Sequence, residues 1–360
     1  MSALFEPITL RGVTSRNRIW LSPMCQYAVD AGDGVPTDWH LVHLGARATG
    51  GFGTVITEAA AVVADGRISP QDAGLWNDEQ AGAWARIVEF LHAQGATAGV
   101  QLAHAGRKSS AHAPWRGHGT IPVADGGWET DAPSALAFGD FAAPRALTRD
   151  GIAGLVAAFA DAARRAVAAG FDLVELHGAH GYLFHQFLSP LSNDRDDDYG
   201  GSFDDRARFL LETVDAVRAA LPDRTPLLVR LSATDWVDGG WSLADTVALS
   251  SRLAGRGVDL VDVSSGGLDP RQEITVGPGY QVPFARDVRA GAGVATGAVG
   301  LITDPKQAEG VLTAGDADVV LLARAALREP SWPLRAAHEL GLSTGEAPYP
   351  VNYTRGAWRD

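Results

Sequence analysis

Two histidines and a tyrosine are the residues of this chain best suited to chemistry. His177, His180 and Tyr182 directly follow Phe171–Leu176, an apolar run that predicts a short buried strand. Two imidazoles can hold one oxygen atom by hydrogen bonds, and a phenol beside them can deliver a proton. This set suits a polarised carbonyl or nitro group that receives a hydride and then a proton.

The histidine pair has two other interpretations. His177 and His180 are also compatible with a structural pair, or with zinc ligands in a metal-dependent barrel hydrolase. No further ligand at metal spacing accompanies them. The longer segment to which they belong, which continues through 187–193 and 199–202, is more specific than the two histidines alone.

Short apolar segments alternate with amphipathic ones along the chain, which predicts strands and helices in series. The predicted strands are Asn17–Met24, Thr54–Ala61, Ala98–Ala103, Phe171–Leu176, Leu227–Ser232, Leu260–Ser264, Gly293–Thr296 and Val319–Leu322. The predicted helices are Asp38–Thr49, Asp78–Ala93, Arg149–Ala169, Asp204–Leu221, Leu243–Ala254, Pro283–Arg289, Pro305–Thr313 and Trp332–Leu340. Capping residues are expected at Thr148, Ser202, Ser242 and Asp304, and glycine stops at Gly95, Gly170, Gly257 and Gly315. Eight such units favour a (β/α)₈ barrel over an open doubly wound sheet, because no GxGxxG follows the first strand.

Two segments lie outside the eight units of this single predicted domain, 1–360. Met1–Arg16 is expected to form a hairpin that closes the barrel floor. The connection after the third strand, 105–147, is too long for an ordinary loop of a barrel. Because such loops lie on the catalytic face, we expect 105–147 to be a capping segment rather than a plain surface insertion.

Polar residues at the ends of several predicted strands should meet at one mouth of the barrel. Gln101 and Arg230 could hydrogen-bond a flat heterocycle, and the guanidinium could stabilise its anionic reduced form. An ion pair of Arg230 with Glu58 or Glu175 is the alternative. After the last two strands, Gly297 and Arg324 resemble a phosphate site built from backbone N–H groups and a cation.

Composition narrows the choice of partners and compartment. The chain has 30 basic and 43 acidic residues, a formal net charge of −13, which argues against nucleic acid and against an anionic membrane. No apolar run is long enough to span a bilayer. Cys25 is the only cysteine, which excludes an internal disulfide and a cysteine-ligated iron–sulfur cluster. Because disulfides are absent, a cytoplasmic protein is expected. Only Lys108 and Lys306 are lysines.

Taken together, these motifs resemble the Old Yellow Enzyme family of FMN-dependent NADPH dehydrogenases and ene-reductases, most closely its thermophilic-like or xenobiotic reductase subclass. The resemblance spans nearly the whole chain. Its motifs are Ser22–Cys25 with Tyr27, Gln101–Lys108, His177–Tyr182, Ser192–Arg195 with Tyr199–Ser202, and Ala295–Gly300.

The resemblance implies non-covalently bound FMN and NADPH as hydride donor. Residues expected at the flavin are Ser22, Pro23, Met24, Cys25, Ala59, Gln101 and Arg230, and those at its phosphate are Gly297, Ala323 and Arg324. Ala323 stands where many family members have glycine. Cys25 is expected to tune the reduction potential of the flavin, and Tyr27 is expected to contact the substrate. The tail 342–360 is expected to reach a neighbouring subunit's site through Arg355 and Trp358, in a homodimer or a tetramer of dimers.

The mechanism implied is ping-pong. NADPH reduces FMN and leaves, and an enone, nitroalkene or related electrophile then binds with its oxygen on His177 and His180. Its β-carbon receives hydride while Tyr182 protonates the neighbouring carbon. A dienoyl-CoA reductase type needs a cysteine-ligated cluster, which one cysteine cannot build. The remaining alternatives are a metal-dependent hydrolase and a barrel that binds FMN without oxidising NADPH.

Overall fold

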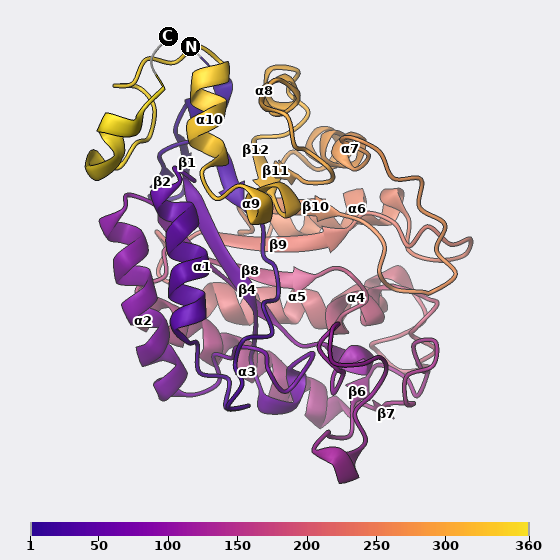
Figure 1. Ribbon diagram of the computed structural model, residues 1–360. Helices are drawn as coiled ribbons and strands as arrows, with labels where there is room; N and C mark the ends of the chain where they lie inside the picture. Colours follow the sequence, from indigo (N-terminus) through magenta and orange to yellow (C-terminus); the bar gives the residue numbers. More distant parts are fainter. Residues whose placement is uncertain (1, 359–360) are drawn as a thin grey trace.

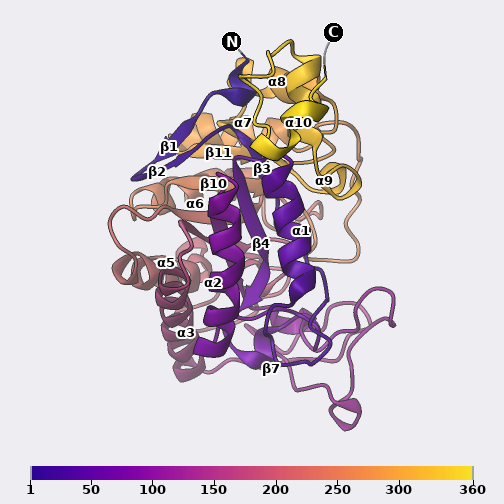
Figure 2. The same cartoon turned by 60° about the vertical axis from the view of Figure 1, so that its left-hand side comes forward.

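The computed structural model describes residues 2–358, which form a closed barrel of eight parallel strands (Figure 1). The barrel strands are β3 (Ile19–Leu21), β4 (Thr54–Ala61), β5 (Thr97–Ala103), β8 (Leu173–Gly178), β9 (Leu227–Ser232), β10 (Leu260–Ser264), β11 (Ala295–Ala298) and β12 (Val319–Leu322). The main outer helices are α1 (Asp38–Thr49), α2 (Asp78–Ala93), α3 (Arg149–Ala168), α5 (Phe203–Ala220), α6 (Leu243–Ala254), α7 (Val282–Ala292), α8 (Pro305–Thr313) and α10 (Trp332–Glu339). Figure 2 shows α1 and α2 lying outside β4. The predicted (β/α)₈ barrel is confirmed.

Most predicted boundaries agree with the structure, and the deviations have local causes. Strand β3 ends at Leu21, before the predicted Met24, and Pro23 lacks the N–H that would continue the ladder. Strand β11 begins at Ala295 rather than at Gly293, because Gly293 has φ +64° and ends α7.

The capping signals act as the sequence indicates. The side chains of Thr148, Ser202, Ser242 and Asp304 each accept a backbone N–H in the first turn of their helix. Gly95, Gly170, Gly257 and Gly315 all have positive φ where the chain leaves a helix. These local signals define where the helices begin and end around the barrel.

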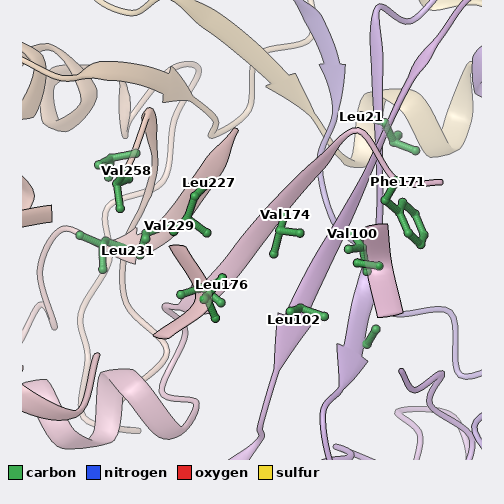
Figure 3. Close-up of a cluster of buried hydrophobic side chains, with 14 of the residues drawn as sticks. Leu21, Val100, Leu102, Phe171, Val174, Leu176, Leu227, Val229, Leu231 and Val258 are labelled. Carbon is green, nitrogen blue, oxygen red and sulfur yellow. The ribbon is translucent and has the colours of Figure 1, made fainter. Parts of the chain in front are cut away.

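The period of two along each strand divides the core into an outer and an inner part. Figure 3 shows side chains of the outer part, such as Val174, Leu176 and Val229, which belong to the cluster shared with the helices. Leu173 and Leu228 belong to a second cluster, with Trp20, Ile56, Leu260, Val319 and Leu321, that fills the barrel floor. By alternation, residues two and four positions after this floor point into the barrel nearer its mouth.

Elements outside the eight units cover both ends of the barrel. The predicted N-terminal hairpin is formed by β1 (Ile8–Leu10) and β2 (Val13–Ser15), and Ile8 and Leu10 pack against the floor cluster. The segment 105–147 contains η3 (Gly106–Lys108), η4 (Val123–Asp125) and the short pair β6 (Asp131–Ala132) and β7 (Arg145–Ala146). The remaining elements are η1 (Ala3–Phe5), η2 (Ala64–Gly66), α4 (Leu183–Leu188), α9 (Arg324–Arg328) and η5 (Val351–Gly356). Within residues 2–358, no helix is both long and apolar enough to cross a membrane.

Candidate active site

The end of β8 brings the two histidines and the tyrosine together. The ring centroids of His177 and His180 are 5.1 Å apart, and those of His177 and Tyr182 are 4.9 Å apart, each pair nearly perpendicular. His177 lies two residues beyond Glu175 and four beyond Leu173 of the floor, so strand alternation directs it to the mouth. The structure therefore brings these three side chains together at the end of β8.

Hydrogen bonds indicate which nitrogen of each imidazole is available. His177 Nδ1 accepts the N–H of Ala179 at 3.3 Å, which leaves its Nε2 as the N–H donor. His180 Nε2 lies 2.7 Å from Ser264 Oγ. If that hydroxyl donates to Nε2, the Nδ1 of His180 carries the proton and can donate to a substrate oxygen.

The surroundings of these rings keep them uncharged. Burial lowers the pKa of His177 and His180 well below the usual histidine value, and the Arg230 guanidinium lowers both further. Burial raises the pKa of Tyr182 well above that of an ordinary phenol, and Cys25 adds to this effect. At neutral pH the site therefore presents two neutral imidazoles beside a protonated phenol.

A polar layer lies directly beneath the mouth. Gln101 Nε2 donates to Glu175 Oε1 at 2.8 Å, and Arg230 Nε lies 3.0 Å from Asp262 Oδ2. All four residues are at most 5% exposed. The ion pair of Arg230 is thus made with Asp262, and not with Glu58 or Glu175 as the sequence alternative supposed. Burial raises the pKa of Glu175 to about 8, and the neighbouring Asp262 charge adds to the shift.

A polar cavity of about 170 Å³ lies where β11 and β12 end. Its lining includes Arg230, Gln281, Gly300, Ala323 and Arg324. Two of the three residues predicted for a phosphate are therefore at this cavity. Gly297 is not among its lining residues: it lies inside β11, where an added Cβ would come 2.4 Å from Leu321. Its lack of a side chain serves strand packing.

The loop after β3 carries the predicted Cys25 and Tyr27. Tyr27 has φ +51°, and its ring meets Trp115 of the segment 105–147 edge-on at 5.6 Å. Glu58 holds this loop by accepting the backbone N–H of Gln26 at 3.1 Å, and its other carboxyl oxygen lies 2.9 Å from His40 Nε2. Burial raises the pKa of the Cys25 thiol, so it is protonated at neutral pH.

The C-terminal tail lies far from this mouth within one protomer. Trp358 stacks on His338 of α10, with ring centroids 5.4 Å apart, and Arg355 is exposed in η5. Both views place the tail beside α10 and the chain's N-terminal part, away from the capping segment (Figures 1 and 2). Arg355 and Trp358 therefore do not reach the mouth of the barrel in this chain. The predicted tail residues 359–360, like Met1, lie outside the described residues.

The chemistry of this donor set fits FMN. Ser22 Oγ is buried and has no hydrogen-bond partner among residues 2–358, and the side-chain amide of Gln101 is held by its Nε2 bond to Glu175 Oε1. Both lie at the barrel mouth together with the Arg230 guanidinium, as a flat ring with N–H and carbonyl groups requires. The cavity that contains Arg324 offers a phosphate a charge-assisted partner.

Three further residues at the mouth were not assigned a role by the sequence. Ser264 bonds His180, Asp262 pairs with Arg230, and Lys108 Nζ donates to the backbone carbonyl of His180 at 2.9 Å. Ser264 and Asp262 lie on β10 with the alternation that directs side chains inward, which is a signal that could have found them. Lys108 lies at the end of η3, a single 3-10 turn in which no periodicity points to its partner.

Known proteins resemble this chain over nearly its whole length. Residues 3–343 match the NADH:flavin oxidoreductase / NADH oxidase family. The chain is 48% identical over 357 residues to an NADPH dehydrogenase of Geobacillus sp. (strain WCH70), covering 99% of this chain and 98% of that protein. Morphinone reductase in complex with tetrahydroNAD superposes with a TM-score of 0.78 at 29% identity, covering 95% of this chain and 92% of that one. A 2-naphthoyl-CoA reductase complex superposes with a TM-score of 0.86 at 25% identity, covering 96% of this chain but 53% of the larger protein.

Proposed function

The chain belongs to the NADH:flavin oxidoreductase / NADH oxidase family and is an FMN-dependent nicotinamide nucleotide oxidoreductase of the Old Yellow Enzyme type, and we propose that it reduces the activated C=C bond of α,β-unsaturated carbonyl and nitro compounds. The observation that carries this proposal is the cluster of His177, His180 and Tyr182, with ring centroids 4.9–5.1 Å apart at the barrel mouth. Enones and nitroalkenes present an oxygen for two N–H donors and a carbon for one proton.

Each residue of the cluster has a distinct role in this proposal. His177 and His180 donate N–H groups to the carbonyl or nitro oxygen, and this withdraws electron density from the β-carbon. Because both imidazoles are neutral, they polarise the substrate without giving up a proton. Tyr182, with a pKa raised by burial, keeps its proton until the neighbouring carbon becomes basic. FMN, when bound, supplies the hydride relay between the nicotinamide nucleotide and this carbon acceptor.

The proposal assigns the flavin site residue by residue. Non-covalently bound FMN would contact Ser22, Pro23, Met24, Cys25, Ala59, Gln101 and Arg230, with its phosphate near Ala323, Arg324 and the backbone after Gly297. Tyr27 would line the substrate side. NADPH and substrate would occupy the same face in turn, which is ping-pong kinetics. We further propose one cytoplasmic FMN-binding domain over 1–360, capped by 105–147 and assembled as homodimers or tetramers of dimers.

The metal-dependent hydrolase is not favoured. His180 is engaged by Ser264, and His177 is flanked by rings rather than by carboxylates. Within the part of the chain that the structure describes, no group of three His, Cys, Asp or Glu side chains could hold a metal ion. The family match points to flavin chemistry as well.

An anaerobic spectral titration tests the proposal. The purified protein should be yellow, and NADPH should bleach the visible absorbance. Adding 2-cyclohexenone without oxygen should restore the absorbance and yield cyclohexanone in equal amount. A protein that NADPH bleaches but that no enone or nitroalkene reoxidises would contradict the substrate class, and a protein that takes up no flavin would contradict the whole proposal.

A further inference from the structure

Lys108 makes an unusual pair of contacts beside the ring cluster. Its Nζ donates to the carbonyl oxygen of His180 at 2.9 Å and also to that of Gly267. These two carbonyls belong to different loops, one after β8 and the other after β10. A single ammonium group therefore joins the backbone of two neighbouring loops at the mouth.

The two loops are in direct backbone contact at this point. A Cβ on Gly267 would come 2.6 Å from the Cα of His180, and one on Gly181 would come 2.2 Å from the carbonyl oxygen of Gly267. His180 itself has φ +57°, a left-handed conformation that is costly for a residue with a side chain. Such a conformation persists only where its surroundings hold it.

Hydrogen bonds hold both backbone groups of His180. Its N–H donates to Ser232 Oγ at 3.0 Å, and Ser232 Oγ donates in turn to the carbonyl of Gly266 at 2.8 Å. Its carbonyl accepts from Lys108. Since the backbone is anchored on both sides, the imidazole can reach Ser264 on one nitrogen and present the other to the mouth.

The capping segment covers the ammonium group. Lys108 Nζ lies 4.1 Å from the ring centroid of Phe138, a cation–π distance. Arg107 holds this part of the segment by donating to Leu136 O at 3.1 Å and to Leu268 O at 2.8 Å. Burial and the neighbouring Arg107 charge lower the pKa of Lys108 to about 7.

We propose that Lys108 is a positioning residue that fixes His180 in its left-handed conformation and couples the capping segment, through Phe138, to the oxygen-binding site. It does not touch substrate. It acts by holding the carbonyl of His180 against the loop after β10. The functional part of this inference rests on the proposed function, because it concerns the histidine that is to bind the substrate oxygen.

Lysine side-chain NMR tests the location of Lys108 independently of any activity. The chain has two lysines, so protein labelled with [ε-¹³C]lysine gives two side-chain signals, and Lys306→Met assigns them. The Lys108 signal should titrate near pH 7, and Phe138→Ala should change its chemical shift, because the aromatic ring 4.1 Å from Nζ is removed. A signal that titrates near the ordinary lysine value of about 10.4 in the parent protein would overturn the proposal.

Phenol binding to the FMN-loaded protein, followed by the flavin spectrum, tests the positioning role. Lys108→Met should raise the phenol Kd about tenfold, the factor that corresponds to 1.4 kcal/mol, and Lys108→Arg should restore part of the affinity. Lys306→Met, a change at an exposed lysine on α8, should leave the Kd unchanged.

The His180→Ala background distinguishes positioning from direct contact. There, Lys108→Met should have no further effect on phenol binding, because its target is already absent. An equal loss in both backgrounds, or an unchanged Kd in Lys108→Met alone, would overturn the positioning role. A parent protein that titrates Lys108 near pH 7 but binds no phenol would instead contradict the proposed function.

Discussion

At the residue scale, the site depends on keeping its hydrogen-bond donors uncharged. A buried imidazolium at His177 would face the Arg230 guanidinium, and this repulsion lowers the histidine pKa further than burial alone. Asp262 neutralises Arg230 within the layer below, at 3.0 Å. The mouth therefore combines neutral N–H donors with a cation that is already paired, so that binding a neutral electrophile costs little desolvation.

Replacing Tyr182 with Phe removes the proton donor and keeps the ring that packs on His177. The half-reaction with 2-cyclohexenone should slow by about 10²–10⁴-fold, the usual contribution of a general acid, although water could replace part of it. Reduction by NADPH should stay nearly unchanged, because no proton passes to substrate there. Stopped-flow absorbance separates the two half-reactions.

Tyr199→Phe is the matched control, because that hydroxyl bonds Glu212 at 3.0 Å away from the ring cluster. It should leave both half-reactions at the parent rate. If Tyr182→Phe slows both half-reactions equally, the phenol is structural rather than catalytic.

The buried carboxyl of Asp72 predicts a pH dependence of stability. Burial, and next the charge of Glu58, raise the pKa of Asp72 to about 7 in the folded protein. The folded state thus holds a proton that the unfolded state releases near pH 4, so the contribution of Asp72 is full below about pH 4 and is lost as pH rises through about 7.

Relative to Asp72→Asn, the parent protein should therefore lose up to about 1.4 kcal/mol of unfolding free energy per pH unit between about pH 4 and 7. Urea unfolding at several pH values measures this difference. Asp125→Asn, at an exposed position of the capping segment, should show no such trend. A difference between parent and Asp72→Asn that does not change with pH would contradict the argument.

Strand alternation and barrel closure together made part of the site predictable. They place Gln101, His177 and Arg230 at one mouth without any contact being known. The contacts of the site residues were harder to predict: Asp262 rather than a glutamate pairs with Arg230, and Lys108 reaches His180 from η3. The Lys108 contact depends on the left-handed backbone conformation of His180, which hydrophobic periodicity does not encode.

At the element scale, hydrophobic periodicity predicts the long helices and the buried strands but not the short helices. The long helices and buried strands carry clear periods and caps, and their boundaries agree with prediction. The short helices α4 and α9 were missed, because five or six residues give no reliable period. Helix α9 follows β12 after one residue, and α4 begins immediately after Tyr182, so both lie in the connections at the mouth of the barrel.

A stacked arginine is one of the contacts that fasten the capping segment to the barrel. The Arg67 guanidinium lies 5.3 Å from the ring centroid of Trp76 and 5.1 Å from that of Trp128. Trp128 Nε1 also donates to Asp65 O at 2.7 Å. Since Trp128 is the partner that belongs to 105–147, it links the middle of this segment to the loop after β4.

Trp128→Ala should free the segment while leaving the barrel intact. Amide exchange within 112–146 should speed up, and the KM for 2-cyclohexenone should rise about three- to tenfold, while the thermal midpoint changes little. Hydrogen-exchange mass spectrometry and steady-state kinetics measure these effects. Val123→Ala, which truncates a side chain that is 63% exposed on the same segment, is the control. Unchanged exchange in Trp128→Ala would mean that other contacts hold the segment.

At the scale of the whole molecule, the C-terminal tail packs on α10 through Trp358 but leaves other large side chains exposed. Val351, Tyr353 and Trp358 are 83%, 54% and 47% exposed, a set of large apolar side chains at one end of the chain. Aromatic residues and arginine are enriched where protein surfaces bury each other. Within one protomer, Arg355 lies far from the ring cluster, so any role in catalysis requires a second copy.

Hybrid dimers test whether the active site is shared between subunits. Truncation from Thr354 onward should raise the KM for enones and leave the protein folded and yellow. Arg355→Ala should do the same, whereas Tyr182→Phe removes the proton donor of its own protomer.

In a dimer that contains one copy of each substitution, the protomer with intact Tyr182 receives the intact Arg355 of its partner. That site should regain parent kinetics, while the other site carries both defects. Mixing the two variants, with exchange of subunits followed by native mass spectrometry, should therefore restore activity toward half the parent value. Mixtures whose activity is only the average of the two separate variants, in a protein that sediments as a monomer, would contradict the composite site.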